Sequence, residues 1–170
     1  MKKNIKIILT VFLLMGGIAL NAQDNKFGHI DSRELLMSMP ESDSAQARIQ
    51  QLAADYDQQM EEMQVELNKK YDDYLTNQET WTELIRQTKE ADLQEMQQRI
   101  QQFQQMAQQD LQTQQTQLMQ PIIEKANNAV KEVAKEGGFI YIFDIGSGNP
   151  VYWSEKSINI MPLVRTKLGL

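Results

Sequence analysis

Residues 41–120 contain neither glycine nor proline, and this stretch of 80 positions limits the possible folds more than any other feature. It is rich in Gln, Glu, Leu, Met and Ala, which all favour helices. Gly28 and Pro40 precede it, and Pro121 follows it. Because ordinary globular helices are far shorter, the stretch predicts a coiled-coil arm rather than part of a compact core.

Two apolar stripes of different phase run along this arm. In the first, Ile49, Met60 and Tyr71 lie eleven residues apart, which is typical of a nearly straight or slightly right-handed coiled coil. In the second, apolar residues follow a heptad pattern from Leu93 to Ala107. The change of phase indicates two helices instead of one.

The apolar rhythm lapses at residues 75–83, near the middle of the arm. Thr80 and Glu83 can form a capping box there, and Thr82 is an alternative N-cap. A turn near 79–82 would fold the arm into an antiparallel hairpin with two equal legs, each about 57 Å long. A continuous rod is the alternative, since the turn has no glycine.

The flanking segments 23–40 and 121–170 predict a small β-rich body. The candidate strands, bounded by turn residues, are 26–31, 139–145, the return strand 151–153, and 158–160. The candidate short helices, with Pro121 in a first turn or a kink, are 32–39, 122–136 and 161–168. Because no further apolar segment is left to cover strands that are apolar on both faces, we expect copies of the chain to complete the sheet as an oligomer.

The first 22 residues have the three parts of a secretory signal peptide. Three lysines precede an uncharged, mostly apolar run at residues 7–20, and Ala22 closes a candidate cleavage site. The run is shorter than the roughly 20 residues of a spanning helix. We therefore expect cleavage before Gln23 and no stable membrane insertion afterwards.

Negative charge is concentrated in the arm. The chain has 17 Lys and Arg against 23 Asp and Glu, a formal charge of −6, and loss of the three signal lysines makes it −9. Residues 41–120 alone carry six cationic and 15 anionic side chains. Because nucleic acids and anionic bilayers repel such a surface, we expect neither as a main partner.

Few residues carry catalytic or metal-binding chemistry. The chain has no cysteine, so disulfides and thiolate sites are excluded, and His29 is its single histidine. His29, Asp31 and Ser32 lie close in sequence, but no nucleophile elbow or oxyanion loop accompanies them. The acidic pairs of the arm lack the ordered spacing of a calcium loop. We expect no catalytic residue, no cofactor and no metal.

The chain resembles the Skp/OmpH family of periplasmic chaperones over almost all of its mature length. The resemblance rests on the signal peptide, the Gln/Glu-rich hairpin, the closing strand pair, and the segments 26–41, 118–126, 133–139 and 164–169. It implies a homotrimer with a small β-barrel body, from which three hairpin arms enclose a cavity. Family members hold unfolded outer-membrane proteins in that cavity without ATP. The best-known enterobacterial member is basic, whereas the arms here are acidic.

The predicted fold is α+β and mostly helical, with a long antiparallel helical-hairpin arm on a small β-body completed by trimerisation. The predicted function is that of an ATP-independent periplasmic holdase for unfolded outer-membrane proteins. A structural coiled-coil spacer or adaptor of the cell envelope is the alternative.

Client contacts are expected to be diffuse. Candidates along the arm, which also suit the coiled-coil seam, are Met60, Met63, Met96, Phe103 and Met106. Candidates for trimer contacts in the body are Ile30, Phe139, Ile140, Tyr141, Ile142, Phe143, Val151 and Trp153. Tyr71, Tyr74 and Trp81 are expected to pack at the tip of the arm.

Overall fold

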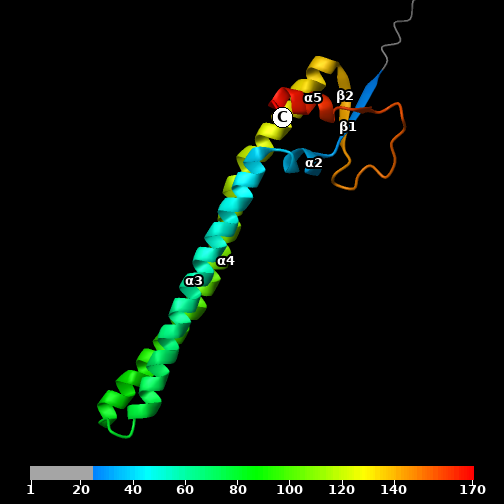
Figure 1. The fold of residues 1–170 in the computed structure, drawn as a ribbon. Helices are drawn as coiled ribbons and strands as arrows, with labels where there is room; N and C mark the ends of the chain where they lie inside the picture. The colour runs from blue at the N-terminus through cyan, green and yellow to red at the C-terminus, as the bar shows by residue number, and fades with distance from the viewer. Residues whose placement is uncertain (1–24) are drawn as a thin grey trace, which may run out of the picture.

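The computed structural model describes residues 25–170, and the predicted signal peptide lies outside them. A long arm extends from a small body (Figure 1). The arm consists of α3 (Pro40–Asn77) and most of α4 (Glu83–Gly137). The body contains β1 (Lys26–Ile30), α2 (Ser32–Met37), β2 (Phe139–Asp144), β3 (Ile158–Asn159) and α5 (Met161–Leu168). The predicted fold class, α+β and mostly helical, is confirmed.

The two arm helices form an antiparallel hairpin whose connection is residues 78–82. Thr82 is the N-cap of α4, and its hydroxyl oxygen accepts a hydrogen bond from the backbone N–H of Ile85 at 3.4 Å. Of the two predicted N-caps, Thr80 and Thr82, the structure therefore uses Thr82. The connection falls in the segment where the apolar rhythm lapses, because no seam residue is needed where the helices separate.

Aromatic packing closes the tip of the arm. The rings of Tyr74 and Trp81 meet edge to face with centroids 6.0 Å apart. The Nζ of Lys89 lies 5.2 Å from the centre of the Trp81 ring, a cation–π contact. Tyr71 is 51% exposed and does not join the predicted packing at the tip.

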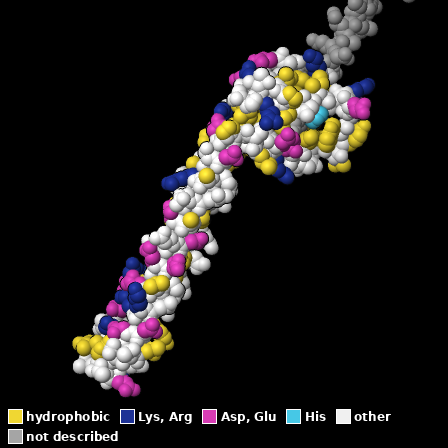
Figure 2. All heavy atoms as spheres, viewed as in Figure 1, with side chains coloured by type: hydrophobic (Ala, Val, Ile, Leu, Met, Phe, Trp, Pro, Cys, Tyr) yellow, Lys and Arg dark blue, Asp and Glu magenta, His cyan; other side chains and the backbone are white. Residues whose placement is uncertain are grey.

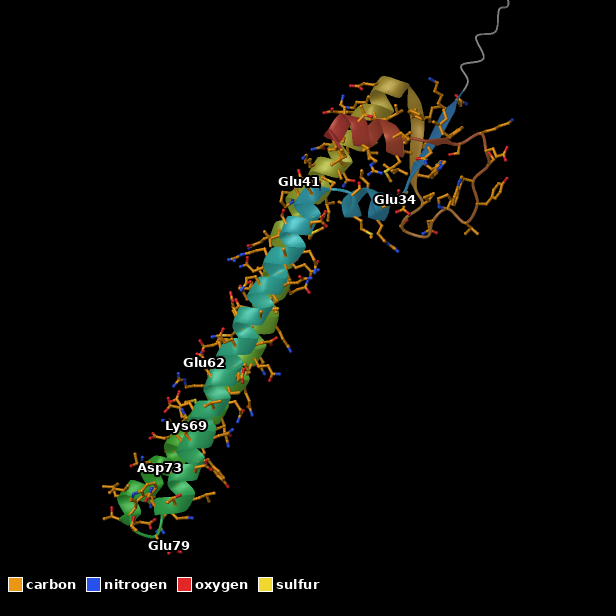
Figure 3. The ribbon with its side chains drawn as sticks, viewed as in Figure 1. Glu34, Glu41, Glu62, Lys69, Asp73 and Glu79 are labelled. Carbon is orange, nitrogen blue, oxygen red and sulfur yellow. The ribbon has the colours of Figure 1, made fainter. Side chains whose placement is uncertain are left out.

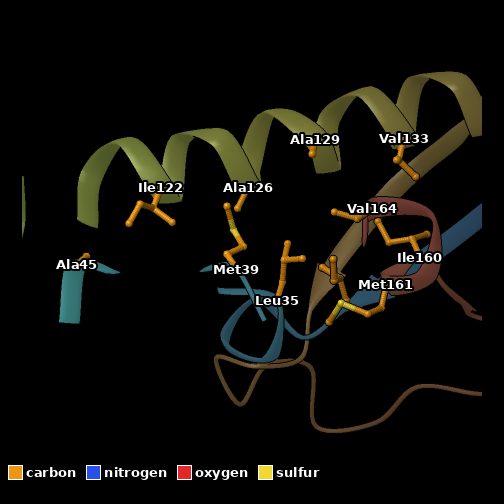
Figure 4. Packing of buried hydrophobic residues seen from close by; sticks show 11 residues of the cluster. Leu35, Met39, Ala45, Ile122, Ala126, Ala129, Val133, Ile160, Met161 and Val164 are labelled. Atoms are coloured by element: carbon orange, nitrogen blue, oxygen red, sulfur yellow. The ribbon is translucent and has the colours of Figure 1, made fainter. Parts of the chain in front are cut away.

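α4 runs from the arm into the body as one helix, so the separate helix predicted at 122–136 is wrong. Pro121 lies in its interior on an exposed face, where the loss of one backbone hydrogen bond is tolerated. Beyond it the buried residues recur at intervals of four, three and four positions and point into the body (Figure 4): Ile122, Ala126, Ala129 and Val133. Burial of this stripe keeps the helix continuous.

The sheet has three parallel strands in the order β2-β1-β3. Ile30 pairs with Asp144 on one side of β1, and His29 pairs with Asn159 on the other. The return strand predicted at 151–153 is wrong: the segment is part of the loop between β2 and β3, and Val151 is 95% exposed. Because β1 occupies the centre, the chain leaving β2 must cross over β1 instead of turning back beside β2.

Helices of the same chain cover one face of this sheet, which corrects the expectation that no segment could do so. The covering residues come from α2, α4 and α5, and they bury Ile30 to 3% exposure. The fully buried side chains at the centre are Leu35, Met39, Ile160 and Val164. Gly28 leaves room for its partner on the neighbouring strand β2, because a Cβ there would lie 2.7 Å from the Cδ1 of Ile142.

Candidate functional site

The seam between α3 and α4 holds the arm together. Its side chains are mostly half-buried: Ile49, Leu52, Tyr56, Met60, Met63 and Leu67 on α3, with Leu93, Ile100, Phe103, Ala107 and Leu111 on α4. Across the seam, Tyr56 and Phe103 meet edge to face with ring centroids 5.9 Å apart. The Tyr56 hydroxyl also donates a hydrogen bond to Asp110 at 2.6 Å. These contacts fix the register of the two helices.

A groove of about 430 Å³ opens between the two helices halfway along the arm. We call it the central-arm groove; it is lined by Gln59, Met63, Glu66, Met96, Arg99, Gln102, Phe103 and Met106. Met96 is only 3% exposed and forms part of the seam, whereas Met106 is 60% exposed. Four of the five predicted client-contact residues line this groove. The fifth, Met60, is half-buried and is not among the lining residues.

The lining of the central-arm groove suits varied apolar ligands. Methionine side chains are unbranched and polarizable, so they adapt to ligands of different shape. Phe103 adds a flat apolar surface, two glutamines add uncharged polar groups, and Glu66 and Arg99 add one charge of each sign. Such a groove can bind many apolar side chains weakly instead of one ligand tightly.

The model of the outer membrane protein (OmpH-like) family matches residues 26–168, which include both the arm and the body. The chain belongs to the OmpH-like family. Among solved structures, a candidate OmpH-like outer membrane chaperone from Caulobacter crescentus CB15 is similar, with a TM-score of 0.74 and 13% sequence identity. The match covers 85% of this chain and 83% of that one. No curated protein matches the chain.

At this level of identity, the similarity between the two OmpH-like chains is one of fold. The family resemblance seen in the sequence is confirmed, and it extends over the whole described architecture. Within residues 25–170, none of the helices combines the length and the apolar character needed to span a membrane.

The OmpH-like arm also exposes apolar residues that the sequence pattern did not identify as contact candidates. Leu75, Leu84 and Ile85 near the tip are 50%, 74% and 44% exposed, and hydrophobic side chains gather there in Figure 2. Val65 on α3 is 44% exposed. Leu84 and Ile85 lie outside both apolar stripes, and this departure from the seam pattern was the signal that could have identified them.

A second apolar surface lies on the face of the sheet opposite the helices. The rings of Phe27 and Tyr141 stack with centroids 6.3 Å apart, and Tyr141 and Phe143 lie 6.1 Å apart. Trp153 approaches His29 at 5.6 Å and is 45% exposed. Phe27, Phe143 and Trp153, together with the neighbouring loop, border a pocket of about 440 Å³.

The predicted trimer-contact residues are divided between two environments. Ile30 is buried in the core of its own chain, and Phe139 and Ile142 pack against that core. The others are exposed by 44% to 95%: Ile140, Tyr141, Phe143, Val151 and Trp153. The exposed members therefore form the part of this set that a partner could contact.

His29, Asp31 and Ser32 each bond to a different partner. His29 Nδ1 lies 2.8 Å from the hydroxyl of Ser157, and Asp31 caps α2 by accepting a hydrogen bond from the N–H of Glu34 at 2.9 Å. The Ser32 hydroxyl donates to Asp144 at 2.6 Å. All three side chains therefore have structural roles in joining β1 to its surroundings.

Asp144 links the end of β2 to the start of α2. Partial burial acts to raise the pKa of this carboxyl group. Hydrogen bonds from Ser32 and from the Gly146 N–H, together with the nearby Arg33, outweigh burial and leave the pKa below its ordinary value. The charged form is therefore the one that stabilises this corner of the body.

Proposed function

We propose that this OmpH-like protein is an ATP-independent holdase of the periplasm, which keeps unfolded outer-membrane proteins soluble in a cavity between the arms of a homotrimer. The central-arm groove carries the proposal, because it presents Met106 at 60% exposure beside Met63 and Phe103. Its family and its similarity in fold to a candidate outer membrane chaperone support the same role.

The groove suits the chemistry of unfolded barrel proteins. Their strands alternate apolar and polar residues, and their unpaired edges aggregate in water. A surface that binds single apolar side chains weakly at several places can keep such strands apart without trapping them. The exposed Leu84 and Val65 extend this apolar surface along the arm.

The aromatic face of the sheet supports assembly into a trimer. Phe27, Tyr141 and Phe143 are 40%, 61% and 44% exposed and lie together on one face. Contiguous exposed aromatic surface of this kind marks protein–protein contacts. In the proposed trimer these rings would fill the interior of a shared β-barrel, and the open edge of β2 would pair with a neighbouring subunit.

The location in the periplasm is part of the proposal. It rests on the family and on the signal pattern of the first 22 residues. Secretion without cysteine also means that packing and assembly must stabilise the protein in place of disulfides.

Dilution of a urea-unfolded outer-membrane barrel protein into the mature protein tests the function. We expect light scattering from aggregation to be suppressed at about one trimer per client, and Met106→Gln to weaken the protection more than Gln105→Asn on the neighbouring exposed position. Sedimentation of the protein with and without client tests the trimer.

The absence of protection at several-fold excess would overturn the holdase function. Saturable binding to a native envelope protein, without binding to unfolded clients, would instead favour a coiled-coil spacer. A monomer that keeps its full fold at micromolar concentration would contradict the trimer.

A further inference from the structure

The central-arm groove adjoins a strongly acidic face of α3. A second groove of about 440 Å³ runs along this face and is lined by Gln58, Glu61, Glu62, Val65, Glu66 and Lys69. Glu66 lines both grooves, so they lie next to each other on α3 with this side chain between them. Figure 3 shows Glu62 and Lys69 projecting from the α3 side of the arm. We call this second surface the acidic groove.

The acidic groove is lined by three carboxylates and one cation, Lys69, so its lining has an excess of negative charge. Among the described residues, one salt bridge reaches Glu61, Glu62 or Glu66, and it joins Glu66 to Lys70 at 3.8 Å. Both side chains of this pair are exposed, so it neutralises little of the local field. Asp55 and Asp57 lie on the preceding turns of the same helix. Val65 is thus exposed among the carboxylates of the acidic groove, whereas Met106 shares the central-arm groove with Glu66 and Arg99.

We propose that the two grooves together bind extended non-native segments in which apolar side chains alternate with Lys or Arg, so that the protein favours cationic stretches of its clients. This inference rests on the proposed holdase function and names the segments it selects. An apolar side chain would enter the central-arm groove against Met63 and Phe103. The next cationic side chains along the segment would meet the carboxylates of Glu61, Glu62 and Glu66, which attract them without a fixed geometry.

Charge decides between the possible occupants of these grooves. A client segment rich in Asp or Glu would be repelled, and so would an anionic bilayer. A groove between two helices receives side chains one at a time, whereas a bilayer needs a broad apolar face. A cationic polypeptide satisfies both the apolar and the acidic parts of the surface.

Three fluorescent peptides test this preference with the mature protein. They share one alternating apolar sequence and differ only at three polar positions, which carry Lys, Gln or Glu. At about 0.1 M salt we expect the Lys peptide to bind about tenfold more tightly than the Glu peptide, measured by fluorescence anisotropy. At about 1 M salt, where the screening length falls to about 3 Å, the ratio should drop below about twofold.

Two matched triple variants locate the effect. The variant E61Q/E62Q/E66Q should bring the Lys and Glu peptides to within about twofold of each other at low salt. The control E34Q/E124Q/E155Q removes the same number of negative charges from exposed positions of the body and should keep most of the preference. Circular dichroism checks that both variants keep the helical fold.

The outcomes separate this inference from the holdase function. If the protein suppresses aggregation of the unfolded barrel protein but binds the Lys and Glu peptides equally, only the charge preference is wrong. If both triple variants lose the preference to the same extent, its assignment to the acidic groove is wrong. Displacement of the Lys peptide by phosphatidylcholine vesicles would show a bilayer site and overturn the proposal. If no peptide binds and aggregation is unaffected, both proposals fail.

Discussion

The hydroxyl of Tyr56 on α3 donates a hydrogen bond to the carboxylate of Asp110 on α4 at 2.6 Å, across 54 residues of sequence. A second pair, Tyr74 and Glu90, repeats this arrangement nearer the tip. Both bonds join the two legs of the hairpin beside the apolar seam. Because a hydrogen bond requires one alignment where apolar packing tolerates several, the pairs specify the register of the arm.

Replacing Tyr56 with Phe tests this register bond. The ring stays against Phe103 and only the hydroxyl is lost, so we expect Y56F to unfold at a lower urea concentration at about pH 7. The bond to Asp110 raises the pKa of Tyr56 above its ordinary value, which means that the fold favours the protonated phenol. The stability that this bond adds is therefore fully present below the pKa of about 10 that Tyr56 has in the unfolded chain. It is lost as pH rises through the higher pKa of Tyr56 in the folded protein.

Urea unfolding followed by circular dichroism, from about pH 7 to about pH 11, measures the difference between wild type and Y56F. The difference should shrink at the alkaline end. Tyr71→Phe is the matched control, because Tyr71 is 51% exposed and lies outside the seam. An equal effect of Y71F would show that the Tyr56 bond does not matter.

Truncation of Leu35 tests the intrachain core of the body. This side chain is 1% exposed between α2 and the helices above it, so L35A should lower the free energy of unfolding by about 2–5 kcal/mol. Met37 in the same short helix is 73% exposed, so M37A should change the free energy of unfolding by less than about 0.5 kcal/mol. Both are measured at one fixed protein concentration, because assembly alters apparent stability.

A Cβ at position 28 tests the close packing between the neighbouring strands β1 and β2. Gly28→Ala would bring a methyl group within 2.7 Å of the Cδ1 of Ile142, so we expect a loss of about 1–3 kcal/mol in unfolding free energy. Ile142→Val removes that Cδ1 atom. The double variant should therefore be more stable than the sum of the two single effects predicts, and strict additivity in thermal or urea unfolding would rule out this contact as the cause.

Acid titration tests the corner held by Asp144. Hydrogen bonds from Ser32 and Gly146 keep its pKa below the ordinary value despite partial burial. The stability that Asp144 adds is therefore present above the unfolded pKa of about 3.9 and is lost as pH falls through the lower folded pKa. Asp144→Asn should be less stable than wild type at neutral pH. The two proteins should converge below about pH 3 in urea unfolding, and a constant gap would contradict this role.

The sequence was most informative about the arm, because its structure depends on local periodicity. The phase change between the Ile49 and Leu93 stripes predicted two helices, and the lapse at 75–83 predicted their connection. The same antiparallel alignment brings Met63 on α3 beside Met96 and Met106 on α4, which no spacing within one helix could reveal. The sequence showed the acidic groove only as an excess of Glu, because its position beside the central-arm groove depends on how α3 packs against α4.

The body was harder to predict because its pairings join segments more than a hundred residues apart. The β-rich composition of 151–153 suggested a strand, but the central place of β1 leaves that segment in a loop. Likewise, Pro121 suggested a boundary, but tertiary burial of Ile122 and Ala126 keeps α4 continuous. In both cases the deciding contacts are tertiary, and local propensity does not contain them.

Because α4 is continuous, the arm and the body share one helix. This helix of 55 residues, about 80 Å long, forms one leg of the hairpin and also covers one face of the sheet. A force that bends the arm at its tip would therefore also act on the packing of Ala129 and Val133 in the body. In the proposed trimer, a large client that pushed the arms apart would therefore also strain the core of the body, so opening of the arms and loosening of the body would occur together.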